Sequence, residues 1–332
     1  MFFVAELSAN HNGSLDRALA IVEAAAKAGA NAIKLQTWLP DSMCLNPSIM
    51  ETWNGIDISL VDLYRKAHTK WEWHRPIFDY AASLGLEAFS TPFDTESVDF
   101  LESLNCPRYK IASNEINDLP LIRYVAKTSK PIILSNGVAT HDELYAAIDA
   151  IDEIHRSCNI NTTRTLKTIL KCVSDYPPKP ENMLLYEITQ MHARFANCII
   201  GFSDHTLGHV AAVIATTLHA RIIEKHIRLD DGVRGVDSHF SATPEEFKKM
   251  VDSCQEAEKM LSPKQPHAFS TRLKRSLFFV RDLCAGHKIT KEDIRSARPN
   301  LGLPPETVGF IIGNTLLYNV KRGDPVLSVI SA

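Results

Sequence analysis

The 332-residue sequence lacks the features that mark membrane, secreted or nucleic-acid-binding proteins. It has no excess of one charge, because 36 Lys and Arg stand against 39 Asp and Glu, and a net charge of −3 does not attract nucleic acid or an anionic membrane. Its longest uncharged stretch, 205–220, is too short for a bilayer span and contains three histidines. The apolar run before Glu6 is too short for the core of a signal peptide.

Cysteine is present but not in patterns that give it a structural role. The seven cysteines are scattered, odd in number and never arranged as C-x-x-C, which argues against a disulfide framework or a zinc ribbon. We therefore expect reduced thiols and a cytoplasmic protein. Because the sequence places no basic partner for Cys172, we expect it to be a buried, unreactive thiol.

The sequence is rich in short β-branched apolar runs that alternate with segments of helical periodicity. The expected strands cover residues 2–7, 31–37, 86–91, 108–113, 131–136, 167–173, 198–204 and 221–227. The clearest helical patterns cover residues 15–28, 72–84, 96–104, 119–127, 142–155, 209–218 and 244–261. Eight strands that alternate with helices predict an α/β protein with a (β/α)8 TIM barrel over residues 1–261. A doubly wound open sheet is the alternative, but no G-x-G-x-x-G follows the first strand.

The residue pattern changes after the last predicted helix. Residues 262–270 contain two prolines and predict a linker, and residues 271–332 predict a small β-rich domain. A domain of about 60 residues is near the lower limit for independent folding. We therefore expect it to dock on the barrel or on a partner chain.

Polar residues gather where the expected strands end, which is where the active sites of barrels lie. They are Glu6, Lys34, Gln36, Lys110, Ser113, Ser135, Lys171, Ser174, Ser203, Asp204, His205, Glu224 and His226. Strand alternation places Lys34 and Gln36 on one face, and likewise Glu224 and His226. Because a charge inside a barrel is costly without a partner or ligand, so many at one rim predict a functional site.

Two histidines at neighbouring strand ends, His205 and His226, suit a divalent transition metal ion that keeps open positions for water or substrate oxygen. The alternative is that they are hydrogen-bonded structural histidines. An amidohydrolase is disfavoured, because such barrels carry His-x-His on the first strand and this one reads Ala5-Glu6-Leu7-Ser8.

Two lysines and several serines at the same end predict an anion site. Lys34 and Lys110 are expected to converge on a phosphate or carboxylate together with Ser113, Ser135 and Ser203, through charge-assisted hydrogen bonds. The alternative is that each lysine only snorkels from the rim of the barrel to solvent.

These motifs resemble the sialic acid synthase family, the phosphoenolpyruvate-dependent nonulosonate synthases. The resemblance rests on the segments AELSANHNGS at 5–14, IKLQT at 33–37, STPF at 90–93, YKIAS at 109–113, GFSDHT at 201–206 and EKH at 224–226. The segment RPNLG at 298–302 is similar to that family's antifreeze-like (SAF) domain. Within the family, the form of the first segment, PDS at 40–42 and WEWH at 71–74 are most similar to pseudaminic acid synthases.

The resemblance implies roles for individual residues. It implies that His205 and His226 bind a divalent ion, usually manganese, and that Glu6 handles a proton or positions the attacking water. It implies that phosphoenolpyruvate is held by Lys34, Lys110, Ser113, Ser135, Ser174 and Ser203. It implies that the amino sugar meets Gln36, Glu115, Tyr176 and Asp237, and that Arg298 reaches the barrel of the other subunit in a domain-swapped homodimer.

The implied reaction condenses phosphoenolpyruvate with an acetamido sugar, with 2,4-diacetamido-2,4,6-trideoxy-altropyranose expected, to give pseudaminic acid and phosphate. Synthesis of N-acetylneuraminate or legionaminate is the alternative, and a non-catalytic sugar-binding protein is an alternative of another class. Asn114 and Asn136 depart from the family's pattern and bear on the identity of the sugar. Relatives often carry a short leader before the first strand, and we expect any dimer contact made by that leader to be missing here.

Overall fold

The computed structural model describes residues 1–53, 55–160, 167–262, 271–327 and 330–331. The chain divides into two compact units, 1–261 and 262–332. Apart from Ser262, the linker expected over 262–270 lies outside the described residues.

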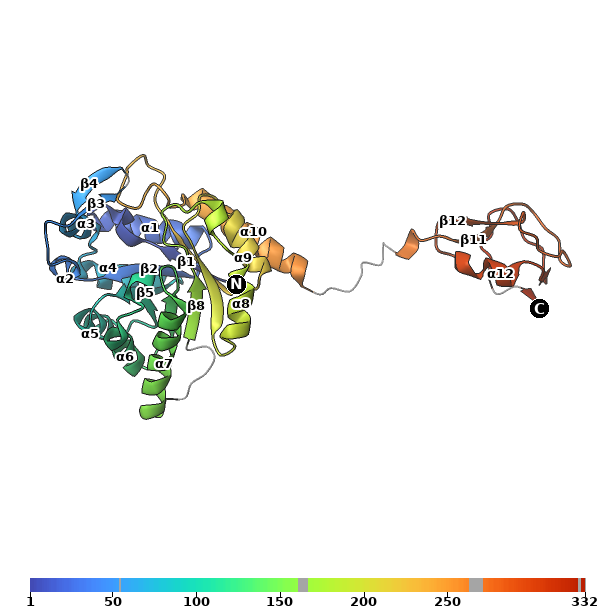
Figure 1. Cartoon of the computed structure of the whole chain (residues 1–332). Coiled ribbons are helices and arrows are strands. Elements are labelled where there is room, and N and C mark those ends of the chain that lie inside the picture. Colours follow the sequence, from blue (N-terminus) through green and yellow to red (C-terminus); the bar gives the residue numbers. More distant parts are fainter. Residues whose placement is uncertain (54, 161–166, 263–270, 328–329, 332) are drawn as a thin grey trace. The chain divides into compact units, whose positions relative to one another are not determined.

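The first unit is a closed barrel of eight parallel strands, which confirms the expected TIM barrel (Figure 1). In chain order the strands are β1 (Phe2–Glu6), β2 (Ala32–Thr37), β5 (Glu87–Pro92), β6 (Tyr109–Ile111), β7 (Ile132–Ser135), β8 (Lys167–Lys171), β9 (Ile199–Asp204) and β10 (Ile222–His226). Each strand pairs with the next, and β10 pairs with β1 to close the barrel. The carboxyl ends of all eight strands therefore meet at one mouth.

Helices on the outside of the barrel cover the apolar outer faces of the strands (Figure 1). They are α1 (Leu15–Lys27), α4 (Trp71–Ser83), α5 (Thr95–Ser103), α6 (Leu119–Lys127), α7 (His141–Ser157), α8 (Glu187–Arg194), α9 (Val210–Thr217) and α10 (Pro244–Leu261). Side-chain caps fix several starts: Ser14, Asp94 and Asp118 each accept a hydrogen bond from a backbone N–H in the first turn. None of the helices within the described residues is long and apolar enough to cross a membrane.

The connection between β2 and α4 contains elements that the sequence did not predict. It holds α2 (Pro40–Met43), a two-stranded hairpin of β3 (Met50–Trp53) and β4 (Ile56–Ser59), and α3 (Leu60–Ala67). The hairpin strands are short and mostly exposed, so they lack the apolar run by which buried strands are recognised.

Short 3-10 helices occur at η1 (Ser8–His11), η2 (Ser113–Glu115), η4 (Pro180–Asn182) and η5 (Pro305–Thr307).

The second unit has a small core of its own, which includes Leu277, Phe279 and Val326. Its elements are β11 (Ser276–Phe279), β12 (Ile294–Ala297), α12 (Val308–Ile311), β13 (Thr315–Leu316) and β14 (Ile330–Ser331). Strands β11 and β12 pair antiparallel, as do β13 and β14. All seven cysteines lie in the described part of the chain, and none forms a disulfide there.

Acid should destabilise the fold through His74, which joins α4 to the barrel. Its Nε2 lies 2.8 Å from Thr37 Oγ1 on β2, and burial lowers its pKa to about 4. Since the unfolded pKa is near 6.5, the stabilisation from neutral His74 is present above pH 6.5 and is lost as the pH falls toward 4. We expect urea unfolding to show a loss of about 2 kcal/mol from this residue between pH 7 and pH 5. The same pH difference in His74→Gln would contradict this assignment.

Candidate active site

Two lysines and two glutamates lie at the centre of the barrel mouth. Lys34 on β2 forms an ion pair with Glu6 on the neighbouring strand β1. Lys110 on β6 donates a hydrogen bond to Glu224 on β10, with 3.3 Å between Nζ and Oε1, and Lys34 Nζ lies 3.9 Å from the same oxygen. Ser203 on β9 donates to this oxygen at 3.1 Å. The structure thus brings together side chains that are far apart in the sequence, and all of them are buried.

The charges of this cluster balance, with two ammonium groups against two carboxylates. Burial opposes the protonation of Lys34, but Glu224 and Glu6 raise its pKa above the ordinary value. Burial also opposes the ionisation of Glu224, but Lys110 and Lys34 lower its pKa, so Glu224 stays a carboxylate. Burial raises the pKa of Glu6 despite its pairing with Lys34. Glu6 is therefore the carboxyl group that can hold or release a proton near neutral pH.

Several buried polar atoms at the mouth have no hydrogen-bond partner among the described residues. They are Glu6 Oε1, Glu115 Oε2, Ser135 Oγ, Glu224 Oε2 and His226 Nδ1. Most buried polar atoms in folded proteins have a partner, because an unsatisfied one costs free energy. The clustering of these atoms at the strand ends indicates that a polar ligand binds there.

A pair of serines lies at the ends of β6 and β8, on either side of β7 in the barrel. Ser113 Oγ and Ser174 Oγ are 2.9 Å apart. Gly137 permits this arrangement, because a Cβ at residue 137 would clash with Ser174 Oγ and would lie 2.9 Å from Ser113 Oγ. Ser135, the last residue of β7, contributes a third buried hydroxyl group.

Replacing Gly137 by Ala is expected to weaken anion binding with little loss of stability. The added methyl group forces the hydroxyl groups of Ser113 and Ser174 to rotate away from their present positions. A hydrogen bond to a charged group contributes about 1.5 to 3 kcal/mol, so we expect the affinity for phosphoenolpyruvate to fall about 10- to 100-fold. Titration calorimetry measures this affinity, and thermal unfolding reports stability. An unchanged affinity would show that the serine pair does not contact the anion.

The two predicted metal-binding histidines face each other at the mouth. The ring centroids of His205 and His226 are 5.4 Å apart, and the ring planes meet at 66°. Nδ1 of His205 is hydrogen-bonded to the carbonyl oxygen of Val173 at 2.9 Å, so the other ring nitrogen is the one available to a metal ion. Burial and the charge of His205 hold the pKa of His226 well below its usual value, which keeps it in the neutral form that binds metal.

These histidines fit an open metal site. No group of three His, Cys, Asp or Glu side chains suited to a metal occurs within the described residues. An ion held by His205 and His226 would therefore take its remaining ligands from water or from substrate oxygens. The unpartnered Nδ1 of His226 is consistent with this arrangement.

The expectation that Cys172 has no basic partner is wrong. The residue is buried, as expected, but the imidazole of His205 is near enough to affect the ionisation of its thiol. Burial opposes ionisation of the thiol, but His205 lowers its pKa below the usual value. The contact arises because β8 and β9 are neighbours in the barrel, so residues more than thirty positions apart meet at the mouth.

Two residues expected at the rim point away from the mouth. Lys171 on β8 donates a hydrogen bond to Glu187 of α8 at 2.6 Å. Asp204 on β9 accepts a hydrogen bond from Lys225 of β10 at 2.8 Å, and both members of this pair are almost fully buried. Strand alternation explains the difference, because Lys225 lies between Glu224 and His226 and must face the opposite side of β10.

The residues expected to meet the sugar also lie around the mouth. The ring of Tyr176 is 4.4 Å from that of His205. Asp237 accepts hydrogen bonds from Ser8 Oγ at 2.6 Å and from the backbone N–H of Ala9 at 3.2 Å, and burial raises its pKa. Burial likewise raises the pKa of Glu115 to about 7, against the effect of Lys110. Gln36 is half-buried two residues beyond Lys34 on β2.

Aromatic side chains that the sequence did not indicate also lie beside Tyr176 and the two histidines at the mouth. Phe240 packs against His226, with 4.7 Å between the centroids, and against Tyr176, with 5.0 Å. Trp53 of the hairpin packs against Tyr176 at 5.7 Å and against His239 at 6.0 Å. These residues lie in loops and in the hairpin, where no periodic pattern marks them.

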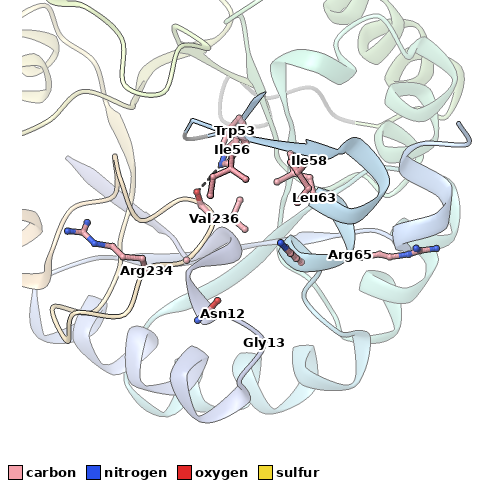
Figure 2. A pocket seen from close by; sticks show the side chains of 11 residues that line it. Asn12, Gly13, Trp53, Ile56, Ile58, Leu63, Arg65, Arg234 and Val236 are labelled. Atoms are coloured by element: carbon pink, nitrogen blue, oxygen red, sulfur yellow. Dashed lines mark hydrogen bonds between the residues drawn. The ribbon is translucent and has the colours of Figure 1, made fainter. Parts of the chain in front are cut away.

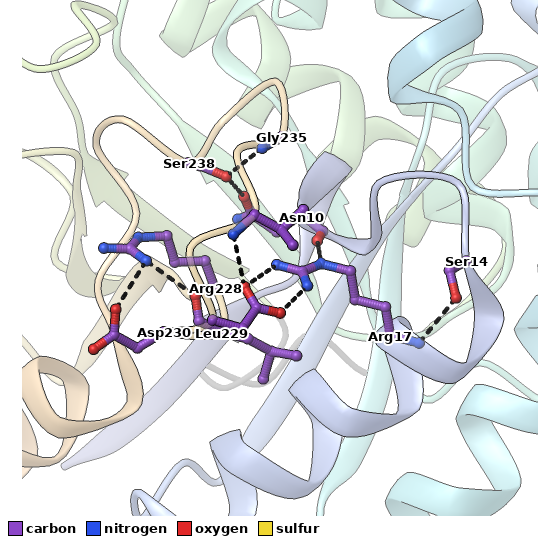
Figure 3. A network of polar contacts seen from close by, with 10 residues as sticks. Asn10, Ser14, Arg17, Arg228, Leu229, Asp230, Gly235 and Ser238 are labelled. Atoms are coloured by element: carbon purple, nitrogen blue, oxygen red, sulfur yellow. Dashed lines mark hydrogen bonds and ion pairs between the residues drawn. The ribbon is translucent and has the colours of Figure 1, made fainter.

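A network of polar contacts holds the segment after β10 against the start of α1 (Figure 3). The side chain of Asn10 donates to the carbonyl oxygen of Ile227 and to Ser241 Oγ, each at 2.9 Å. Arg17 donates to the carbonyl oxygen of Asn10 and forms an ion pair with Asp231. Because Asp237 lies inside this segment, the network positions its carboxylate at the mouth.

Two departures from the family pattern have different surroundings. Asn136 Oδ1 accepts a hydrogen bond from the backbone N–H of Cys172 at 2.9 Å and so joins the ends of β7 and β8. Asn114 is exposed within η2.

Arg298 lies in the second unit after β12, is exposed, and forms no ion pair within the described residues of that unit.

Comparison with known proteins gives matches over both units. Residues 21–266 match the NeuB family model, and residues 274–328 match the SAF domain model. A pseudaminic acid synthase from Helicobacter pylori is 41% identical over 97% of this chain and 95% of its own length. An N,N'-diacetyllegionaminic acid synthase from Legionella pneumophila is 33% identical over 98% and 93%. The crystal structure of an N-acetylneuraminic acid synthetase from Leptospira borgpetersenii, in complex with citrate, has a TM-score of 0.71 and 28% identity, and the alignment covers 81% of this chain and 88% of that one.

Proposed function

Since this chain belongs to the NeuB family, we propose that it condenses phosphoenolpyruvate with an acetamido sugar to give a nonulosonic acid and inorganic phosphate. The sugar we assign is 2,4-diacetamido-2,4,6-trideoxy-altropyranose and the product pseudaminic acid. The similar proteins from Helicobacter pylori and Legionella pneumophila carry the names of synthases for pseudaminic acid and diacetyllegionaminic acid, respectively. The single observation that carries the proposal is the cluster of buried lysines and unpartnered polar atoms at the mouth.

The lysine cluster is suited to an anion with more than one charge. In the protein alone, Glu224 supplies the negative charge between Lys34 and Lys110. The phosphate and carboxylate groups of phosphoenolpyruvate would bring further negative charge to the two ammonium groups and to the serine hydroxyls of β6, β7, β8 and β9. Donors fixed in advance in a water-poor site hold such a substrate without reorganisation.

In the proposed reaction, C3 of phosphoenolpyruvate forms a bond with C1 of the open-chain sugar aldehyde. The aldehyde oxygen becomes an alkoxide that takes up a proton, and water adds at C2. The bond between C2 and the bridging oxygen then breaks, so that phosphate leaves with that oxygen and C2 becomes a ketone as its new hydroxyl group loses a proton. Glu6 takes the proton of the attacking water, because burial has raised its pKa toward the range of a general base. Lys34 and Lys110 hold the phosphate throughout.

His205 and His226 would hold a divalent metal ion, for which we propose manganese. When bound, such an ion supplies Lewis acidity toward a carbonyl oxygen of the sugar. Two contacts hold the imidazole rings in place. His205 is hydrogen-bonded to the carbonyl oxygen of Val173, and Phe240 packs on His226.

The direct test is release of phosphate from phosphoenolpyruvate with Mn²⁺ and a panel of acetamido sugars. We expect release with the diacetamido-trideoxy-altrose and weaker release with N-acetylmannosamine. Preference for N-acetylmannosamine or for the legionaminate precursor would assign one of the alternative products, and binding of sugar with no phosphate release would indicate a sugar-binding protein. With ¹⁸O at the bridging position of phosphoenolpyruvate, the label should leave in phosphate. Label retained in the nonulosonate would exclude this route.

We also propose a cytoplasmic homodimer in which Arg298 of one chain reaches the sugar site of the other. The support is the resemblance of the RPNLG segment, the exposed position of Arg298 and the seven cysteines without disulfides. Replacing Arg298 by Ala is expected to raise KM for the sugar about 10-fold, as loss of one charge-assisted hydrogen bond does. At a phosphoenolpyruvate concentration far below the raised KM expected of Lys110→Met, mixing this variant with Lys110→Met should restore part of the activity, because one mixed site keeps both residues. No restoration would place Arg298 in its own subunit's site or in none.

A further inference from the structure

The hairpin tip at the barrel mouth has no role in the proposed chemistry, yet it contacts residues of the site. Trp53 and Ile56 form the last pair of the β3–β4 ladder, beside the turn. The indole N–H of Trp53 donates a hydrogen bond to the carbonyl oxygen of Val236 at 2.9 Å. Val236 precedes Asp237 in the segment held by the network of Figure 3. A two-stranded hairpin is marginally stable alone, so these contacts fix the tip over this part of the mouth.

Aromatic rings connect Trp53 to the metal-binding histidines. The ring of Trp53 is 5.7 Å from that of Tyr176, which is 4.4 Å from that of His205. Phe240 lies against Tyr176, His205 and His226. One wall of the mouth is therefore made of uncharged rings, in contrast to the lysine cluster that suits the anionic substrate.

A pocket of about 530 Å³ beside Trp53 has both apolar and cationic lining residues (Figure 2). Its apolar side chains are those of Trp53, Ile56, Ile58, Leu63 and Val236, and its polar ones are those of Asn12, Arg65, Lys66 and Arg234. No carboxylate lines this pocket among the described residues. Because the only polar atom of the indole is already bonded to Val236, the ring offers a neighbour its apolar surface and no hydrogen bond.

The length of the open-chain sugar can be compared with the spacing of these rings to find which of them its far end meets. Its aldehyde carbon must lie by the histidines and lysines, where the new bond forms. An open six-carbon chain spans roughly 6 Å, since each C–C bond is about 1.5 Å long. The ring centroid of Tyr176 is 4.4 Å from that of His205, and the centroid of Trp53 is 5.7 Å from that of Tyr176. A chain of this length that starts at His205 and follows the row of rings therefore extends past Tyr176 toward Trp53.

We infer that Trp53 is a specificity-determining residue that selects sugars with apolar substituents at the end remote from the aldehyde, such as a methyl group at C6. This inference rests on the proposed function and deepens it. A methyl group against the indole loses contact with water at no polar cost, whereas a hydroxyl group there has no partner from Trp53. An apolar pocket discriminates against an added hydroxyl group by up to about 100-fold.

The test uses two sugars that differ by one hydroxyl group: the 6-deoxy diacetamido sugar and its 6-hydroxy analogue. We expect wild-type enzyme to prefer the deoxy sugar about 10- to 100-fold in kcat/KM. Trp53→Ala should lower this ratio at least fivefold and leave KM for phosphoenolpyruvate unchanged. Glu51→Ala, an exposed substitution in the same hairpin, should keep the wild-type ratio.

The outcomes separate this inference from the proposed function. Phosphate release by wild-type protein with an unchanged preference in Trp53→Ala would overturn the role of Trp53 and leave the function intact. No release with any sugar would overturn both. If Trp53→Ala does not fold, Trp53→Phe decides: it keeps a ring but loses the N–H, and should retain most of the preference. Loss of the preference in Trp53→Phe, which keeps an apolar ring at this position, would also overturn the inference.

Discussion

Replacing His226 by Ala is expected to abolish turnover that depends on a divalent metal, with a loss of at least about a thousandfold in kcat. His226 and His205 are the imidazoles that meet at the mouth, and no third group of metal-binding type joins them within the described residues. With one imidazole gone, a single protein ligand cannot hold the ion. His205→Ala should have the same effect, and chelation of the wild-type protein should reproduce it.

The measurement is phosphate release at increasing Mn²⁺, combined with metal binding by titration calorimetry. His141→Ala is the matched control, because His141 begins α7 on the surface and contacts Arg194. It should leave both metal affinity and turnover unchanged. Full activity of His226→Ala after chelation would remove the two-histidine site from the mechanism.

Replacing Lys110 by Met is expected to raise KM for phosphoenolpyruvate about 100-fold, the second-largest effect. Lys110 donates to Glu224 inside the barrel, so its removal leaves two carboxylates for Lys34 alone. The cluster then carries a net negative charge before the anionic substrate arrives. Truncating one member of a buried charge pair costs about 2 to 5 kcal/mol in binding, and every 1.4 kcal/mol is about tenfold in affinity.

Lys171→Met provides the matched control for this prediction. Lys171 is also a buried lysine on a barrel strand with a carboxylate partner, but it faces Glu187 on the outside. This variant should lose stability in thermal unfolding and keep a normal KM for phosphoenolpyruvate. Equal values of KM in the two variants would mean that the lysines at the mouth do not bind the anion.

The sequence predicted the barrel because buried parallel strands leave a strong local signal. The expected strand at 31–37 contains β2, and the expected strand at 221–227 contains β10, each as an apolar β-branched run between helical patterns. The hairpin of Trp53 leaves no such signal, since its strands are four residues long and largely exposed. Its position depends on the contact with Val236, nearly two hundred residues away.

The site was predictable in its residue types and less so in its pairings. Strand-end position and alternation placed Lys34, Lys110 and His226 at the mouth. The pairing of Cys172 with His205 depends on the order of strands around the barrel and on rotamers, which no local pattern encodes. The same holds for Glu224, whose carboxylate lies between two lysines contributed by other strands.

Strand β10 carries an ionisable side chain at three consecutive positions, and this restricts how the chain can change during evolution. Glu224 and His226 face the mouth, while Lys225 faces outward to Asp204. A shift of β10 by one residue would bury Lys225 beside Lys34 and Lys110. The side chains of Glu224 and His226 would then face the surrounding helices. Insertions and deletions within β10 should therefore be rejected during natural divergence. Changes of length just after His226 are restricted as well, because Ile227, Asp231 and Val236 each make a contact that holds the segment of Asp237.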